Sequence, residues 1–358
     1  MPTGLLIVNF GGPQSPDELV PFLQRLFRQV LPLPEALKPL IVPRLAASRA
    51  KKVGPNYQAI GWSPIIPETG RQMSALIDAL GEGAPPTAMG MMFSEPSVQD
   101  ALRELKTQGV DRIVALAMFP HFSLETTVPA FQRVSDGLVA MGEPDLPVHY
   151  LPPFYDHPLY IQSLVNTIKR GLQNLPGEGP VHLLFSAHGL PQYVVNKGDP
   201  YPDQIRETVR RVITTLEWAD PVDLSWQSRV GPTRWLAPST TEMVSDLGKR
   251  GVQRLLFVPV SFVGEHIETL HEIDIELSEH ARSAGIPHVG RAPALGLDAD
   301  FIACLADLTR SALKRFEHYQ CVRCLLPKPA EHRRQKTCPN CRFSTPAYLS
   351  RGNAFLAH

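Results

Sequence analysis

The stretch RLLFVPVSFVGEHIETLHEIDIELSE, residues 254–279, decides the fold of this chain. Its first part, Leu255 to Val260, is an unbroken apolar run of strand length, which favours a strand covered on both faces within a parallel sheet. Its second part carries glutamates in steps of three or four residues, which places them on one stripe of a helix: Glu265, Glu268, Glu272, Glu276 and Glu279. The helix is expected to begin where the strand ends, and open α/β sheets bind ligands at that place.

This row of acids has two interpretations. A charged helix face is most often a solvated outer face. Few basic residues lie three or four positions away to pair with these acids, however, and His266 and His271 lie beside them. Carboxylate with imidazole is a reasonable site for a divalent cation, so both interpretations stay open.

Length and composition set the outer limits. The chain has 358 residues, which is long for one hydrophobic core, so two domains are expected. Lysine plus arginine equals aspartate plus glutamate at 35 each, so the charge gives no reason to expect nucleic acid. No leader or presequence and no apolar run of about 18 residues is recognisable, which predicts a soluble, cytoplasmic protein. All five cysteines lie at or after Cys304, which excludes a disulfide framework in the main body and favours a reducing compartment.

Strand and helix patterns alternate from the start of the chain. Residues 5–10 predict a buried strand before a glycine turn, and Ser15 is expected to cap a helix over 15–30. Later helices are expected over 68–80, 97–108 and 128–141, and strands over 87–93, 112–119 and 147–151.

Residues 31–57 interrupt this alternation. They are rich in proline and leucine and contain four basic residues, Arg44, Arg49, Lys51 and Lys52. The segment is either an irregular loop with a short helix, or an apolar lip with basic flanks that covers a site or touches a membrane.

The second half of the chain repeats the first. Six residues of one helix-turn-strand unit recur 142 positions later: Pro96, Ser97, Leu105, Gly109, Val110 and Arg112 correspond to Pro238, Ser239, Leu247, Gly251, Val252 and Arg254. Two further matches are Leu6, Gly11 and Pro13 with Leu184, Gly189 and Pro191, at an offset of 178, and residues 124–126 with 267–269, with a slip of one residue. The repeat predicts an α/β fold of two similar Rossmann-like, doubly wound domains, each with a parallel four-stranded sheet, over 1–152 and 153–318. The cleft between them is the expected site.

The stretch FSAHGLP, residues 185–191, supplies a candidate base. His188 follows a buried strand, and the repeat makes that strand end face the same cleft as Glu268. A lone histidine is more often structural. Histidine is nevertheless the natural base near neutral pH, and a neighbouring carboxylate would hold its tautomer and stabilise the charged form.

The stretch WQSRVGPTRW, residues 226–235, adds aromatic faces and two arginines. Such a loop suits a flat apolar ligand that bears carboxylates. The alternative is a structured loop with Trp235 in the core.

Four stretches carry a family resemblance: FSAHGLP, the following VVNKGDPYP, WQSRVGP with Trp235, and residues 258–276. Together they resemble the ferrochelatases, which insert Fe(II) into a porphyrin to make haem. The resemblance covers about residues 4–315 in order. It implies two Rossmann-like domains with the porphyrin between them.

The resemblance also implies roles for single residues. His188 and Glu268 are expected to be catalytic, by taking protons from the pyrrole nitrogens or by handing over the metal. A metal or proton path is expected to comprise His188, Glu268, His266, Glu272 and Glu276. The substrate-binding residues are expected to be Phe10, Arg49, Tyr57, Ser123 and Trp235, and His121 is expected to be a wall residue rather than a further metal ligand.

Function hypotheses of other classes stay open at this point. A porphyrin or metal carrier on the same scaffold is one, and a cobalt or nickel chelatase is another. The intact pair of His188 and Glu268 favours an enzyme, since a carrier needs no proton acceptor. Protoporphyrin IX and coproporphyrin III are both candidate substrates. A homodimer and a peripheral membrane contact through residues 31–57 are further expectations.

The tail, residues 319–358, contains a four-thiolate pattern. Cys321 and Cys324 form one CxxC pair, and Cys338 and Cys341 form a second. Spacing alone favours a structural zinc site. The resemblance favours a [2Fe-2S] cluster, because many ferrochelatases carry one on a C-terminal extension, although here all four ligands would come from the tail. Cys304 is expected to be a small buried hydrophobe.

Overall fold

The first strand shows why each half of the chain forms a parallel sheet. In β1 (Thr3–Asn9), residues Leu5 to Val8 are at most 1% exposed, so both faces of the strand are covered. β1 lies inside a four-stranded parallel sheet with the strand order β2-β1-β3-β4. The structure is a computed structural model and describes residues 2–31, 33–231 and 233–318, with side chains up to residue 314.

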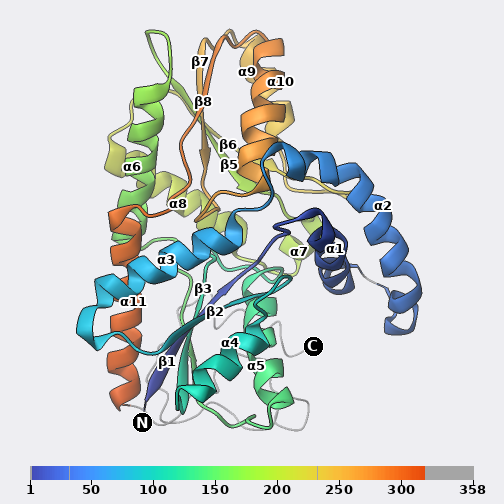
Figure 1. Cartoon of the computed structure of the whole chain (residues 1–358). Coiled ribbons are helices and arrows are strands. Elements are labelled where there is room, and N and C mark those ends of the chain that lie inside the picture. Colours follow the sequence, from blue (N-terminus) through green and yellow to red (C-terminus); the bar gives the residue numbers. More distant parts are fainter. Residues whose placement is uncertain (1, 32, 232, 319–358) are drawn as a thin grey trace.

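The first half runs from β1 to β4. After β1 its elements are α1 (Pro16–Val30), η1 (Glu35–Leu37), α2 (Lys38–Ala59), α3 (Ile65–Leu80), η2 (Gly81–Gly83), β2 (Thr87–Met91), α4 (Val98–Thr107), β3 (Arg112–Ala117), α5 (Thr127–Ala140) and β4 (Val148–Tyr150). Helices α4 and α5 pack on one face of the sheet, and α3 and the last helix pack on the other. α1 and α2 project from the side of the molecule (Figure 1).

The second half builds the same sheet again. Its elements are α6 (Pro158–Asn174), β5 (His182–His188), α7 (Gln192–Asn196), α8 (Tyr201–Leu216), β6 (Val222–Gln227), α9 (Thr240–Lys249), β7 (Arg254–Pro259), η3 (Glu268–Leu277), α10 (Ser278–Ser283), β8 (His288–Arg291) and α11 (Ala299–His318). The strand order β6-β5-β7-β8 is the order of the first sheet with each strand replaced by its repeat partner. The predicted α/β fold with two parallel four-stranded sheets is confirmed.

The pairing register confirms the repeat residue by residue. Leu6 in β1 pairs with Ala115 in β3, and Leu184 in β5 pairs with Phe257 in β7. The first members differ by 178 positions and the second members by 142, the two offsets found in the sequence. α4 and α9 also begin alike, because Ser97 and Ser239 each close a capping box with an acid three residues later.

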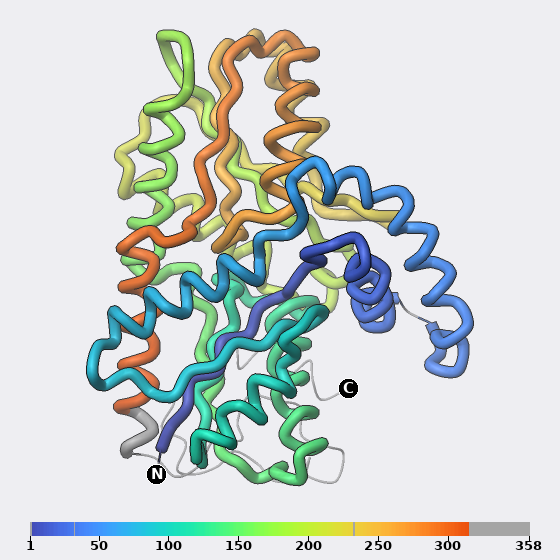
Figure 2. Tube along the Cα trace, viewed as in Figure 1, coloured from blue at the N-terminus to red at the C-terminus, as the bar shows by residue number. Residues whose placement is uncertain are grey.

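One hydrophobic cluster spans the two halves. A single cluster of buried residues contains Leu5 and Leu116 from the first sheet and Leu183 and Phe185 from the second. Helix α11 joins the halves, because it packs against both α6 and α3. Figure 2 shows this last helix, in orange-red, running alongside the first sheet after the chain has completed the second. The proposed domain boundaries at residues 152 and 318 stay a prediction.

The interpretation of residues 31–57 as an irregular loop was wrong. Residues 38–59 form the 22-residue helix α2, which contains Pro43 and Pro55 in its interior. Pro39 lies in the first turn, where its missing N–H costs nothing, and strong helix formers lie between the interior prolines, among them Ala46, Ala47, Arg49, Ala50, Lys51 and Lys52.

The acidic helix also differs from the prediction. η3 is a π-helix, so its backbone turns are wider than the α-helical turns on which the single stripe of five glutamates was based. Glu265 precedes η3 and Glu279 lies in α10, where it is exposed. The glutamates therefore do not form one stripe.

Two other expectations concern the membrane and the tail. No helix within residues 2–31, 33–231 and 233–318 is both long and apolar enough to cross a bilayer. The four cysteines of the tail, Cys321, Cys324, Cys338 and Cys341, lie outside the described residues. Cys304 is fully buried, and burial raises the pKa of its thiol to about 12, which agrees with a hydrophobic role.

Candidate active site

His188 is the last residue of β5 and stands at the carboxyl edge of the second sheet. Its backbone N–H donates to the Ser261 hydroxyl at 3.0 Å, and its side chain is 39% exposed. The next residue must be small, because a Cβ on Gly189 would lie 2.9 Å from the carbonyl oxygen of Gln227. The strand end and the glycine turn thus fix the histidine at the surface of the site.

Glu268 is the direct partner of His188. It is the first residue of η3, and its Oε2 lies 2.7 Å from Nδ1 of His188. Burial opposes the charged form of both groups. The attraction between them outweighs burial: it raises the pKa of His188 and, with help from His266 and Ser228, holds the pKa of Glu268 at about 2. The pair is therefore an imidazolium and a carboxylate over a wide range of pH.

Ser228 links Glu268 to the next acid of the helix. Its Oγ lies 2.9 Å from Oε2 of Glu268 and 2.6 Å from Oε2 of Glu272, and its backbone N–H donates to Oε1 of Glu272 at 2.8 Å. A hydroxyl has one proton, so it can donate to only one of the two carboxyls at a time. Burial and repulsion from Glu268 raise the pKa of Glu272 above its ordinary value. The four groups form a hydrogen-bonded line from His188 to Glu272.

The position of Ser228 is held by an uncommon backbone conformation. Its φ is +65°, in the left-handed region that non-glycine residues seldom adopt. The preceding residue supports it, because the Gln227 amide donates to the carbonyl oxygen of Glu268 at 3.0 Å. The sequence prediction missed Ser228 and Gln227 as site residues, although both lie in the WQSRVGP stretch that it singled out.

The other members of the predicted path lie close by but do not all converge. His266 is held by Thr269, whose N–H donates to its Nδ1 at 3.3 Å, and burial lowers the pKa of its ring. Glu276 lies farther along η3, is 56% exposed and pairs with His271 at 3.4 Å. Within the part of the chain that the structure describes, no group of three or more His, Cys, Asp or Glu side chains could hold a metal ion.

The first half brings an aromatic residue near Glu268. Tyr57 of α2 is 8% exposed, stacks on Trp62 and has its pKa raised by burial and by the charge of Glu268. Arg49 lies on the same helix and is exposed. Its positive charge is near enough to Tyr57 to oppose the rise in the pKa of Tyr57. Phe10 packs against Phe93 with ring centroids 4.7 Å apart. Since the offset is 178, Phe10 occupies in the first half the position that His188 occupies in the second.

Ser123 and His121 lie in the contact between the halves. Ser123 is 1% exposed and donates to Asp199 Oδ2 at 2.8 Å. His121 is also buried, burial lowers its pKa to about 3, and its Nε2 bonds to Thr208 at 3.0 Å. The substrate-binding role of Ser123 stays a prediction.

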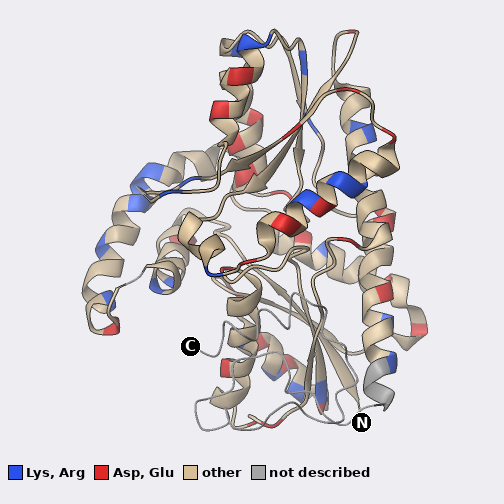
Figure 3. Cartoon of the chain, turned by 180° about the vertical axis from the view of Figure 1, so that it is seen from behind, with Lys and Arg blue, Asp and Glu red and all other residues tan. Residues whose placement is uncertain are grey.

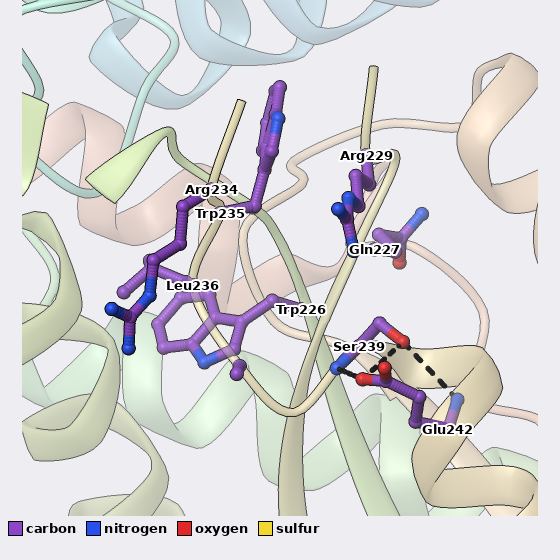
Figure 4. A pocket seen from close by; sticks show the side chains of 10 residues that line it. Trp226, Gln227, Arg229, Arg234, Trp235, Leu236, Ser239 and Glu242 are labelled. Carbon is purple, nitrogen blue, oxygen red and sulfur yellow. Dashed lines mark hydrogen bonds between the residues drawn. The ribbon is translucent and has the colours of Figure 1, made fainter. Parts of the chain in front are cut away.

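Trp235 belongs to a segment that braces the turn after His188. Backbone bonds join Gln192 to Arg234 and Leu236 to Leu190. A cavity of about 170 Å³ lies behind this segment, bordered by Trp226, Trp235 and Gln227 but by neither His188 nor Glu268. Its volume is small for a ligand of tetrapyrrole size. Figure 4 shows Arg229 and Arg234 on opposite sides of this cavity, so the two guanidinium groups do not converge.

Comparison with known proteins identifies the family. A family model described as Ferrochelatase matches residues 2–313. The chain belongs to the ferrochelatase family. The ferrochelatase of Geotalea uraniireducens is 42% identical over 315 residues, which cover 87% of this chain and 98% of that protein. The mitochondrial ferrochelatase of Bos taurus is 37% identical over 329 residues, which cover 88% of this chain and 78% of that protein.

A solved structure agrees with the ferrochelatase assignment at the level of the fold. SirB from Bacillus subtilis with Fe3+ has a TM-score of 0.54 and 12% sequence identity, and the match covers 89% of this chain and 98% of that chain. At this identity the likeness shows the fold alone. The resemblance stated from the motifs is thus confirmed for the family and the fold.

Replacing Glu268 tests the electrostatic account of this ferrochelatase site. The change Glu268→Gln is expected to lower the pKa of His188, because burial then acts on the imidazole with only the charge of Glu272 to oppose it. Proton-detected NMR titration of the imidazole measures the shift. Glu276→Gln is the matched control, since Glu276 pairs with His271, and it should leave the titration of His188 unchanged. An unmoved His188 titration in Glu268→Gln would refute the pairing.

Proposed function

We propose that this ferrochelatase inserts Fe(II) into a porphyrin and that His188 and Glu268 carry the reaction. Membership of the family supports the activity, since relatives that match most of the chain at 37–42% identity are named ferrochelatase. The observation that carries the assignment of residues is the 2.7 Å contact between Nδ1 of His188 and Oε2 of Glu268.

His188 has the geometry of a general base. Glu268 accepts from Nδ1, so the lone pair of the neutral ring lies on Nε2, for which the described residues supply no hydrogen-bond donor. A porphyrin must lose two N–H protons as the metal enters its four-nitrogen plane. Nε2 can take a pyrrole proton, and the carboxylate of Glu268 then stabilises the imidazolium that results.

The hydrogen-bonded line offers a route by which the proton taken from the porphyrin can leave His188. From His188 it continues through Glu268 and Ser228 to Glu272, whose raised pKa lets it hold a proton. Beyond Glu272, the pair of His271 and Glu276 lies toward the solvent end of η3. Imidazole and carboxylate also suit Fe(II), which they carry without the tight binding that thiolates would give. We assign the metal or proton path to His266, Glu272 and Glu276 on this basis.

The porphyrin is proposed to lie between the halves. Phe10 and Tyr57 present aromatic surface from the first half, and Tyr57 senses the charge of Glu268. Aromatic walls suit a flat macrocycle, and binding energy spent on bending the ring exposes the nitrogen lone pairs and lowers the barrier. Arg49 and Trp235 are the other proposed substrate contacts. Protoporphyrin IX and coproporphyrin III both fit this chemistry.

The tail is proposed to hold a [2Fe-2S] cluster, with structural zinc as the alternative. The two CxxC pairs supply four thiolates, the donor set that both groups accept.

Removal of the imidazole tests the proposed function. His188→Ala is expected to lower the rate of Fe(II) or Zn(II) insertion into protoporphyrin and coproporphyrin by about 10² to 10⁴, the usual contribution of a general base. In the unchanged protein the rate should rise as the pH passes upward through the raised pKa of His188, because only the neutral ring accepts a proton. His157→Asn is the control, because asparagine can still accept from the Leu159 N–H at the start of α6. Its insertion rate should equal that of the unchanged protein. Full activity of His188→Ala would show that His188 is not the general base of the reaction.

We also propose that α2 contacts a membrane surface from the cytoplasm. Leu40 is 62% exposed and Leu45 is 43% exposed, and Figure 3 shows basic residues along the same helix. Apolar side chains with lysines and arginines favour an interface with anionic lipids.

The membrane proposal predicts that Leu40→Asp weakens sedimentation of the protein with phosphatidylserine-containing vesicles, because an acid replaces exposed apolar surface and faces lipids of the same charge. Leu297→Asp, at a leucine outside α2 that is 52% exposed, should sediment like the unchanged protein. Equal sedimentation of all three proteins would exclude this contact.

The absorption spectrum of freshly purified protein tests the tail. A [2Fe-2S] cluster predicts visible absorption and about two iron atoms per chain, both lost in Cys338→Ser, because each thiolate is a ligand. A colourless protein that contains zinc would establish the alternative. Cys304→Ala is the control, since this buried thiol is distant from both CxxC pairs in the sequence.

A further inference from the structure

Two polar side chains of α3 in the first half bind the active-site loop of the second half. Oε2 of Glu68 accepts from the backbone N–H of Glu265 at 2.7 Å. The amide of Gln72 donates to the carbonyl oxygen of Val263 at 2.9 Å and to that of Gly296 at 3.1 Å. Both side chains are buried, at 7% and 2% exposure. The loop that leads into η3 is therefore held from the opposite half of the molecule.

The second half makes the corresponding contact with the first. Oε1 of Gln204 in α8 accepts from the backbone N–H of Phe122 at 2.7 Å, and Thr208 bonds to His121 at 3.0 Å. Here too the two helix residues are four positions apart, so both lie on one face of the helix. The loop that they bind follows β3, just as the loop bound by α3 follows β7.

The two contacts are related by the repeat. Gln204 accepts from the N–H of Phe122, and Glu68 accepts from the N–H of Glu265. Phe122 and Glu265 are 143 positions apart. The same offset relates Thr126 to Thr269, the match found in the sequence with a slip of one residue. Each half thus binds the loop after the third strand of the other half, through residues at positions i and i+4 of one helix.

Only one of these loops leads to the pair of His188 and Glu268. Glu265, bound by Glu68, lies three residues before Glu268. The side chain of Glu265 is fixed as well, by Arg291 at 3.0 Å and by the Thr269 hydroxyl at 2.6 Å. Between the α3 contacts lies Gly264, where a Cβ would stand 2.9 Å from the carboxyl oxygen of Glu68. The loop has little freedom to move on either side.

We propose that Glu68 and Gln72 are positioning residues, through which the first half holds residues 263–265 and so keeps Glu268 in contact with His188. This role rests on the function proposed above, because it assigns these residues to the same reaction. Neither side chain touches His188 or Glu268 in the described contacts, so they act through the backbone of the loop.

The state of Glu68 decides which substitution is conservative. Burial raises its pKa to about 7, and the Glu265 carboxylate adds to the rise, while the Glu265 N–H and Arg71 oppose it. Near neutral pH a large share of Glu68 is uncharged. Glutamine is uncharged and keeps an oxygen that can accept from Glu265, whereas alanine removes the acceptor.

The test compares Glu68→Ala, Glu68→Gln and Gln204→Ala in the full chain. Glu68→Ala is expected to lower kcat for zinc insertion about tenfold to a hundredfold with a small change in KM, because Glu268 is misplaced. It should also lower the pKa of His188 toward the value found in Glu268→Gln. Glu68→Gln should restore both quantities to within about threefold in kcat. Gln204→Ala removes the corresponding contact of the other half and should lower Tm while leaving the His188 titration unchanged.

A second pair of variants tests the same contact from the loop side, and Gly264→Ala does so with Glu68 still in place. Gly264→Ala is expected to lower kcat by crowding the Glu68 carboxyl, and Glu68→Ala in the same chain makes room for the new methyl group. The double variant should therefore lose less activity than the product of the two single losses. Multiplicative losses would overturn the proposal, as would an equal effect of Glu68→Ala and Gln204→Ala on the pKa of His188. Absence of metal insertion by the unchanged protein would instead refute the proposed function, and the His188 titration would still test the positioning.

Discussion

The site depends on one interaction, the ion pair between His188 and Glu268. Burial disfavours the charged form of each group, and each is charged because the other lies 2.7 Å away. A small displacement of either side chain would remove the cause of both pKa shifts. This dependence explains why so many bonds converge on the loop before η3, from Ser261 at its start to Glu265 near its end.

Much of the fold could be predicted because its signals are local. Buried strands such as residues 255–259 are uninterrupted apolar runs in the sequence. The helix-turn-strand unit is recognisable because its residues recur in the second half. Helix α2 could not be predicted, because its prolines suggest a loop. The helix-forming residues between the prolines outweigh that tendency. The π-helical form of η3 could not be predicted either, because the glutamate spacing fits an α-helix equally well.

The site divides in the same way. His188 and Glu268 were predictable from their places after two strands and from the family resemblance. Ser228, Glu68 and Gln72 were not, because their roles come from contacts between distant parts of the chain, 40 positions apart for Ser228 and Glu268 and 197 apart for Glu68 and Glu265. In the sequence Glu68 is an ordinary polar residue of a helix. The sequence shows the repeat, but the roles of Glu68 and Gln72 become apparent only when the contacts of α3 are compared with those of α8.

The core that the halves share limits how the protein can move. Leu5, Leu116, Leu183 and Phe185 belong to one buried cluster, and α11 packs across both halves. A scissor-like opening of the two sheets would expose this surface, and large apolar interfaces of that kind resist rigid-body motion. We expect a flat ring to enter through rearrangement of the α1 and α2 arm, which stands outside the shared interior, while the frame that carries the base and the acid stays closed.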